Sequence, residues 1–151
     1  MSKIQFPHPS AGQFRNGARL ASFARAAYPS DFNFQIAVKR EAEKRHGTCH
    51  SWNRGNTGGL VILFKSMAIV CIAGSNDELD WRNNRDFVRK PLWQLAEDYS
   101  LPIRGQKKTR VHNGIGTYAA QVAMELQEEF PQLADYEHVY VCGHSLGRAA
   151  A

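Results

Sequence analysis

The amino-acid sequence predicts an α/β fold with a partly parallel sheet, in one domain that spans residues 1–151. Residues 60–64 and 67–72 are short apolar runs rich in β-branched side chains, which is the composition of strands. Residues 113–130 then show helical spacing of apolar side chains, and a third strand-like run follows at 138–142. A helix between two strands is the connection that a parallel pair requires, so this order favours an α/β fold.

Two helices are predicted before the first strand. Residues 13–29 have apolar side chains at helical spacing, and the proline at the end of this segment closes the helix. Ser30 or Asp31 can cap a second helix, which runs to about His46 and stops at Gly47. The side chains expected to face inward on the second helix are Phe34, Val38 and Ala42.

The middle of the chain combines a loop, a pair of strands and a mixed segment. Residues 54–59, RGNTGG, form a loop by composition. Only two residues, Lys65 and Ser66, lie between the runs 60–64 and 67–72, which suggests a hairpin or two consecutive strands. The second run is apolar almost throughout, as in a strand that is covered on both faces. A turn at 74–77 follows directly, and a short helix is predicted near 93–98.

The C-terminal part is predicted as helix, strand, turn and helix. Pro131 stops the helix that begins at Asn113, residues 138–142 form a strand, residues 143–147 turn, and a further helix begins at Arg148. The apolar positions at helical spacing in the first of these helices are Ile115, Tyr118, Ala119, Val122, Leu126 and Phe130.

The turn between the last strand and the last helix carries a candidate nucleophile. Gly143-His144-Ser145-Leu146-Gly147 fits the pattern G-x-S-x-G between a strand and a helix, which lifts a serine above the edge of a sheet. The two glycines leave room for a sharp turn, and the N–H of Leu146 would face a developing oxyanion. The alternative is a glycine-rich connection that contains an ordinary serine.

Three segments resemble the class 3 lipases, a fungal-lipase-like group of α/β hydrolases. They are GHSLG after HVYVC, AIVCIAGSNDELDW at 68–81 and VHNGIGTYAA at 111–120. The resemblance implies an incomplete α/β-hydrolase fold, with N-terminal helices and a mostly parallel sheet that ends at the nucleophile strand, turn and helix. It implies hydrolysis of carboxylic esters, with acylglycerols or phospholipids as substrates and Ser145 as the nucleophile. Ser75 matches the family's oxyanion residue and would join Leu146 in the oxyanion hole, and Gly143, His144 and Gly147 complete the nucleophile elbow.

Neither of the two histidines near these segments is the expected catalytic base. His112 precedes a helix, His144 adjoins the nucleophile, and the chain order in this fold is serine, then acid, then histidine. The family's acid and base lie downstream of the serine, and nothing follows Ala151. We therefore expect a partial domain whose C-terminal part is missing, with little activity alone. The alternative is a non-catalytic lipid-binding or protein-binding module derived from a lipase.

The net charge of +5 includes a basic cluster that could bind an anionic partner. The favoured interpretation is a solvated loop, and the alternative is a site for nucleic acid or an anionic lipid surface. No nucleic-acid motif accompanies the cluster, so the expected partner is a lipid or ester substrate, with a lipid surface as a further candidate, and the sequence assigns no oligomeric state. The cluster consists of Arg104, Lys107, Lys108 and Arg110.

The cysteines and the N-terminus indicate a reduced environment and no bound metal. An odd count of three cysteines without a signal peptide argues against a disulfide framework and favours buried free thiols. His46, Cys49 and His50 have a hint of metal spacing, but no second pair stands out, so neither a metal nor a cofactor is expected. With no signal peptide and no apolar run that could span a bilayer, the default expectation is a cytoplasmic protein. Export by a route that needs no N-terminal signal is the alternative.

Overall fold

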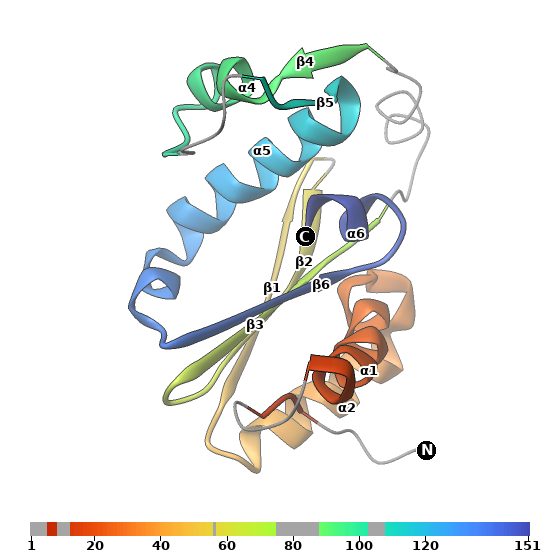
Figure 1. Ribbon diagram of the computed structural model, residues 1–151. Helices are drawn as coiled ribbons and strands as arrows, with labels where there is room; N and C mark the ends of the chain where they lie inside the picture. Colours follow the sequence, from red (N-terminus) through yellow and green to blue (C-terminus); the bar gives the residue numbers. More distant parts are fainter. Residues whose placement is uncertain (1–5, 9–12, 56, 75–87, 103–107) are drawn as a thin grey trace.

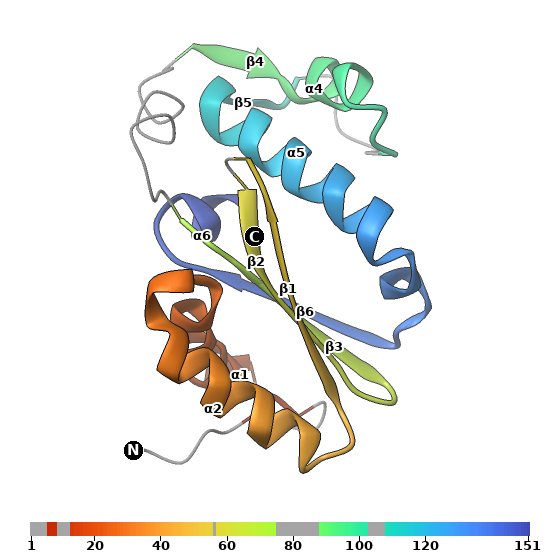
Figure 2. The ribbon, with the colours of Figure 1, turned by 180° about the vertical axis from the view of Figure 1, so that it is seen from behind.

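A computed structural model of the chain describes residues 6–8, 13–55, 57–74, 88–102 and 108–151. Its centre is a four-stranded sheet with helices on both faces (Figures 1 and 2). The strands of this sheet are β1 (Thr48–Arg54), β2 (Thr57–Leu63), β3 (Met67–Ile72) and β6 (His138–Gly143). The helices are α1 (Gln13–Phe23), η1 (Ala24–Ala27), η2 (Pro29–Asp31), α2 (Phe32–Glu43), α4 (Leu92–Asp98), α5 (Asn113–Glu129), η3 (Pro131–Asp135) and α6 (Leu146–Ala150).

The sheet is mixed, and the expectation of a mostly parallel sheet is wrong for the described residues. The strand order is β1-β2-β3-β6, in which β1–β2 and β2–β3 are antiparallel and β3–β6 is parallel. The physical reason is the length of the connections. Only a few residues join β1 to β2 and β2 to β3, and such short links allow antiparallel pairing alone. The connection from β3 to β6 is long and contains α5, so these two strands can run parallel.

Strand β1 was not predicted, and the predicted loop at 54–59 is mostly strand. Residues 48–54 pair in register with β2, which begins at Thr57, and Gly55 in the turn has a φ of +57°. Sequence periodicity does not identify β1 because it lies at the edge of the sheet and buries only Trp52. Cys49 and His50 are neighbours on this strand, and their side chains therefore point to opposite faces of it. Among the described residues, no three His, Cys, Asp or Glu side chains are placed to hold a metal ion.

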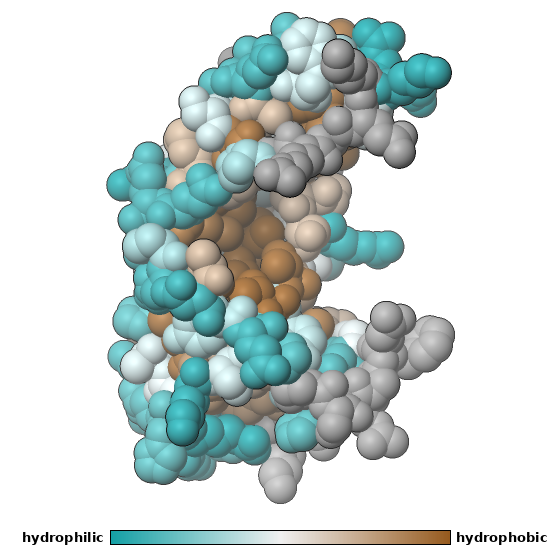
Figure 3. All heavy atoms as spheres, turned by 60° about the vertical axis from the view of Figure 1, so that its left-hand side comes forward, coloured by the Kyte–Doolittle hydropathy of each residue, from teal (hydrophilic) through white to brown (hydrophobic). Residues whose placement is uncertain are grey.

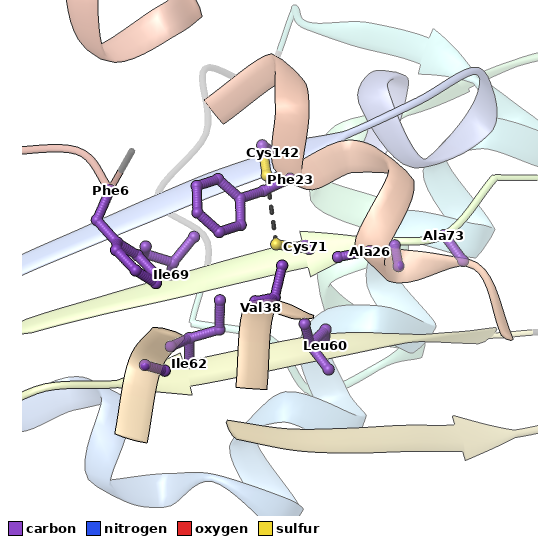
Figure 4. Packing of buried hydrophobic residues seen from close by; sticks show 12 residues of the cluster. Phe6, Phe23, Ala26, Val38, Leu60, Ile62, Ile69, Cys71, Ala73 and Cys142 are labelled. Carbon is purple, nitrogen blue, oxygen red and sulfur yellow. Dashed lines mark hydrogen bonds between the residues drawn. The ribbon is translucent and has the colours of Figure 1, made fainter. Parts of the chain in front are cut away.

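The core has two layers, one on each face of the sheet. Alternate residues of β3 enter different layers: Ile69 and Cys71 face α1 and α2, whereas Val70 and Ile72 face α5. This confirms that β3 is covered on both faces. The layer under the N-terminal helices, shown in Figure 4, contains Phe6, Phe23, Ala26, Val38, Leu60, Ile62, Ile69, Cys71, Ala73 and Cys142.

Most of the predicted helices are confirmed. The second helix ends at Glu43 and the chain turns before Gly47, whose N–H donates to the carbonyl of Ala42. Val38 and Ala42 are buried, and Phe34 packs against the same core layer. Helices α4 and α5 match the predicted segments, whereas the last helix begins at Leu146 rather than at Arg148. None of the helices in the described part of the chain is long and apolar enough to cross a membrane.

Two of the thiols meet in the core, as expected for buried free cysteines. Cys71 and Cys142 are direct partners on β3 and β6, and their Sγ atoms lie 3.5 Å apart (Figure 4). The thiol of Cys142 donates a hydrogen bond to Cys71, and this bond and burial raise the pKa of the Cys71 thiol. Cys49 is partly buried, and desolvation raises its pKa to about 11. Because thiolates are the reactive form, the raised pKa values of Cys49 and Cys71 keep these two thiols protonated and inert at neutral pH.

Strand β6 forms an edge of the four-stranded sheet. Val139 and Val141 are 42% and 41% exposed, whereas Cys142 on the same strand is buried under the N-terminal helices. Figure 3 shows apolar side chains gathered in a hollow between two more polar ends of the molecule. In the sheet formed by the described residues, β6 therefore has a paired strand on one side only, which is β3.

Candidate nucleophile elbow

Ser145 lies in a strained turn between the end of β6 and the start of α6. Its backbone has a φ of 54° and a ψ of −123°, a combination that costs a residue with a Cβ atom about 1–3 kcal/mol. Such strain persists only where the surrounding structure holds the chain in place, and it is concentrated at functional sites. The side chain of Ser145 is exposed, so a reactant can approach the hydroxyl.

The turn is held by glycines that bring backbone segments into direct contact. A Cβ atom on Gly147 would lie 2.3 Å from the carbonyl oxygen of Ile72 and 2.4 Å from that of Ala73. A Cβ atom on Gly143 would lie 2.3 Å from the carbonyl carbon of Gly147. Real Cβ atoms do not approach other atoms so closely, so the first turn of α6 rests on the end of β3 only because both positions lack a side chain.

His112 and His144 both make structural contacts. His112 is the N-cap residue of α5, and its Nδ1 accepts a hydrogen bond from the N–H of Ile115 at 3.3 Å. The ring of His144 points toward the N-terminal region, where its Nδ1 lies 3.0 Å from the hydroxyl of Tyr28. Within the described ranges, the hydroxyl of Ser145 has no histidine or carboxylate hydrogen-bond partner. Ser75, the expected second oxyanion residue, lies outside the described residues.

Tyr28 is a site residue that no sequence pattern predicted. Its hydroxyl accepts a hydrogen bond from the N–H of Gly74 at 3.1 Å and also contacts Nδ1 of His144. Both contacts are satisfied when the hydroxyl donates to Nδ1 and the neutral imidazole carries its proton on Nε2. A Cβ atom on Gly74 would lie 2.4 Å from this hydroxyl and 3.1 Å from the Cβ of Ser145. Tyr28 therefore ties the end of β3 to the elbow.

A shallow depression opens beside the elbow. Its volume is about 670 Å³, and Arg148 is the charged residue among those that line it. Arg148 is exposed, and the contact of this short helix with the sheet is made by Gly147. The lining residues are Ala21, Ala24, Gly143, His144, Ser145, Arg148 and Ala149.

A family model described as Lipase (class 3) matches residues 69–151, which is more than half of the chain. The chain belongs to the class 3 lipase family. The match confirms the resemblance and implies a lipase-like hydrolase with an α/β-hydrolase-like fold. No curated protein sequence matches this chain at a significant level.

The matched part of the lipase chain starts within β3 and includes α5, β6 and the elbow. Helices α1 and α2 and strands β1 and β2 precede it. Tyr28 therefore lies outside the matched residues, although its hydroxyl contacts two segments inside them. No motif marks Tyr28 in the sequence, because its role arises only when distant parts of the chain come together.

We predict that Tyr28→Phe weakens the elbow of this lipase chain while leaving the fold intact. The substitution removes the hydroxyl and leaves the Gly74 N–H and the His144 ring without their partner, which should cost about 1–2 kcal/mol of unfolding free energy. For a chain of this size, that corresponds to a decrease of roughly 2–8 °C in the midpoint of thermal unfolding. The matched control is Tyr136→Phe, because the hydroxyl of Tyr136 forms no hydrogen bond with any residue that the structure describes. Equal midpoints for both variants would contradict the role of Tyr28.

Proposed function

We propose that Ser145 is the nucleophile of carboxylic ester hydrolysis, acting on acylglycerols, phospholipids or other esters with acyl chains. The observation that carries this proposal is the backbone of Ser145: an exposed serine is held at a φ of 54° between a strand and a helix. Together with a ψ of −123°, this φ is a strained combination, and such strain is concentrated at functional sites. Membership of the class 3 lipase family supports the same chemistry.

In the proposed reaction, Oγ of Ser145 attacks the carbonyl carbon of the ester. The Oγ–C bond forms, the alcohol leaves as the C–O bond breaks, and water then releases the acid from the acyl-serine. The N–H of Leu146, at the start of α6, is the proposed donor to the oxyanion, together with the backbone at Ser75. Leu146 is itself buried, which fixes the position of its backbone. None of the residues that the structure describes is placed as a base beside the hydroxyl of Ser145. We therefore expect slow acylation of Ser145 in this chain alone.

We predict that added imidazole increases the reaction of Ser145 with an alkyl fluorophosphonate. The Oγ–P bond forms, fluoride leaves, and imidazole accepts the hydroxyl proton in place of a histidine. The phosphoryl oxygen occupies the position of the oxyanion, so the donors of the elbow should favour Ser145 over other serines by about tenfold or more. Intact mass spectrometry with peptide mapping measures the rate and the site of the adduct.

The controls separate a placed nucleophile from an exposed hydroxyl. Ser145→Ala removes the nucleophile and should abolish the imidazole-dependent adduct. Ser100→Ala removes an exposed serine that also has a positive φ, of 52°, but that does not lie in an elbow, and it should change nothing. An adduct distributed over several serines in the folded chain, or none on Ser145 at any imidazole concentration, would contradict the proposal.

A second candidate function is a non-catalytic lipid-binding or protein-binding module. Val139 and Val141 on β6 favour this candidate, because both are exposed and, among the described strands, β6 is paired on one side only, so another chain could pair there. The two candidates differ in the fluorophosphonate experiment: a binding module predicts a cooperatively unfolding chain without a specific adduct on Ser145.

A further inference from the structure

Arg148 is an exposed cation next to the candidate nucleophile. It follows Ser145 by three residues, and its N–H donates to the carbonyl of Ser145 at 3.1 Å, so one helical turn separates the two residues. Both residues line the depression beside the elbow. The guanidinium of Arg148 forms no ion pair with any carboxylate that the structure describes. Its N–H donors are therefore available to a molecule in the depression.

His144 supplies a second donor to the same depression, which it also lines. Its Nδ1 lies 3.0 Å from the hydroxyl of Tyr28, and that hydroxyl accepts a hydrogen bond from the N–H of Gly74. The hydroxyl has one proton, which it donates to Nδ1, so the proton of the neutral ring is on Nε2. No hydrogen bond between described residues uses this Nε2–H, and the side chain of His144 is exposed. The contact with Tyr28 thus leaves Nε2–H as a free donor.

The rest of the depression suits a small molecule rather than a bare ion. Its volume of about 670 Å³ is typical of sites for small organic ligands. Ala21 and Ala24 from the N-terminal helices and Ala149 of α6 supply apolar lining, and α6 lies above the N-terminal helices in Figures 1 and 2. None of the residues that line the depression is acidic, so an anion there meets no carboxylate of the lining. These features fit a molecule that combines an anionic group with carbon atoms.

We propose that this depression binds the phosphate or carboxylate group of an ester substrate, with Arg148 and the Nε2–H of His144 as donors. A planar guanidinium can donate two parallel hydrogen bonds to two oxygens of such a group. Because both donors belong to residues that line the depression with Ser145, a bound anion keeps a nearby ester carbonyl within reach of its hydroxyl. The substrate class is then an anionic ester rather than a neutral acylglycerol.

Binding of glycerol 3-phosphate to the full chain tests the anion site without any reaction. The assignment of the bound molecule as a substrate rests on the proposed nucleophile, whereas the anion site does not. At constant pH and ionic strength, glycerol 3-phosphate should shift the Nε2 resonance of His144 in a chain labelled with ¹⁵N, and glycerol should not. Arg148→Gln should weaken this binding about fivefold to tenfold, because it removes exposed hydrogen bonds to a charged group. Arg148→Lys should bind with intermediate affinity, because it keeps the charge without the planar donors.

The matched control is Arg89→Gln, which removes an exposed arginine that does not line the depression. Arg89 belongs to β4 (Arg89–Pro91), which pairs with β5 (Arg110–His112) in a separate two-stranded sheet. This variant should bind glycerol 3-phosphate as tightly as the unaltered chain. Equal affinities of the two glutamine variants, or no shift of the His144 resonance, would overturn the proposal. Tighter binding of inorganic phosphate than of glycerol 3-phosphate would overturn the assignment to a substrate, because the site would then recognise a free ion.

Two fluorophosphonates of different charge connect the anion site to Ser145. They differ only in a carboxylate or a carboxamide on the alkoxy arm, and both react in the presence of imidazole. The unaltered chain should favour the carboxylate about fivefold to tenfold, Arg148→Gln should show little preference, and Arg148→Glu should favour the carboxamide. The same preference in all three chains would overturn the role of Arg148. Binding of glycerol 3-phosphate through Arg148 without any adduct on Ser145 would support the anion site and contradict the nucleophile.

Discussion

Gly147→Ala is expected to destabilise this class 3 lipase chain by about 3 kcal/mol or more, the upper part of the range for added volume in a packed core. The new Cβ atom would lie 2.3 Å from the carbonyl oxygen of Ile72 and 2.4 Å from that of Ala73. These are backbone atoms of β3 and its end, and no side chain can rotate to relieve the contact. The first turn of α6 must therefore move away from the sheet, and Ser145 must move with it.

Chemical denaturation measures this loss of unfolding free energy, and Gly17→Ala is the matched control. Gly17 is exposed in α1, and a Cβ atom there would meet nothing within 4 Å. Alanine is the better helix former by about 0.5–1 kcal/mol, so this control should be neutral or stabilising. A Gly147→Ala chain that unfolds at the same denaturant concentration as the unaltered chain would show that the elbow does not pack on β3 as described.

The second large effect is expected for Tyr118→Ala, at about 3–5 kcal/mol, the range for deleting a buried aromatic ring. Tyr118 is 1% exposed, packs in the layer between α5 and the sheet, and donates a hydrogen bond of 2.7 Å to the carbonyl of Ala73. Removal of the ring leaves a cavity beneath α5 and an unpaired carbonyl at the end of β3. A domain of ordinary stability has only about 5–15 kcal/mol in total, so the variant should be partly unfolded near body temperature.

Tyr118→Phe separates the contribution of the ring from that of the hydroxyl. It retains the packing and removes only the bond to Ala73, so we expect a loss of about 1–2 kcal/mol of unfolding free energy. Thermal unfolding of the two variants gives the loss of unfolding free energy in each, and the two losses can then be compared. If Tyr118→Phe costs as much as Tyr118→Ala, the hydrogen bond rather than burial of the ring holds α5 on the sheet.

Tyr28 and Tyr118 act on neighbouring parts of the same segment from opposite faces of the sheet. The hydroxyl of Tyr28 accepts a hydrogen bond from the N–H of Gly74, and the hydroxyl of Tyr118 donates a hydrogen bond to the carbonyl of Ala73. The end of β3 is thus held from both core layers, directly before the segment that contains Ser75. This arrangement makes the positions of Ala73 and Gly74 depend on α5 and on the N-terminal region together.

Local patterns in the sequence were enough to predict several elements. The helical spacing of Tyr118, Val122 and Phe130 predicted α5, and the apolar run of 67–72 predicted a strand covered on both faces. Glycine spacing around Ser145 predicted a turn between a strand and a helix. These predictions succeeded because the period of a helix, the alternation of a strand and the absence of a side chain are properties of neighbouring residues.

Other features could not be predicted because they depend on contacts between distant segments. Strand β1 contains mainly polar, exposed residues, and only its pairing with β2 makes it a strand. Ser145 could be named from its motif, but its φ of 54° results from the packing of Gly147 on Ile72 and Ala73, far away in the sequence.

The sequence by itself determined the family, the nucleophile candidate and the helices and strands with strong periodicity, because each is encoded in residues that lie close together along the chain. Only the tertiary structure decided that the sheet is mixed and that Tyr28 supports the elbow. These features join residues that are far apart in the chain, and their energies come from hydrogen bonds and steric contacts that exist only after folding.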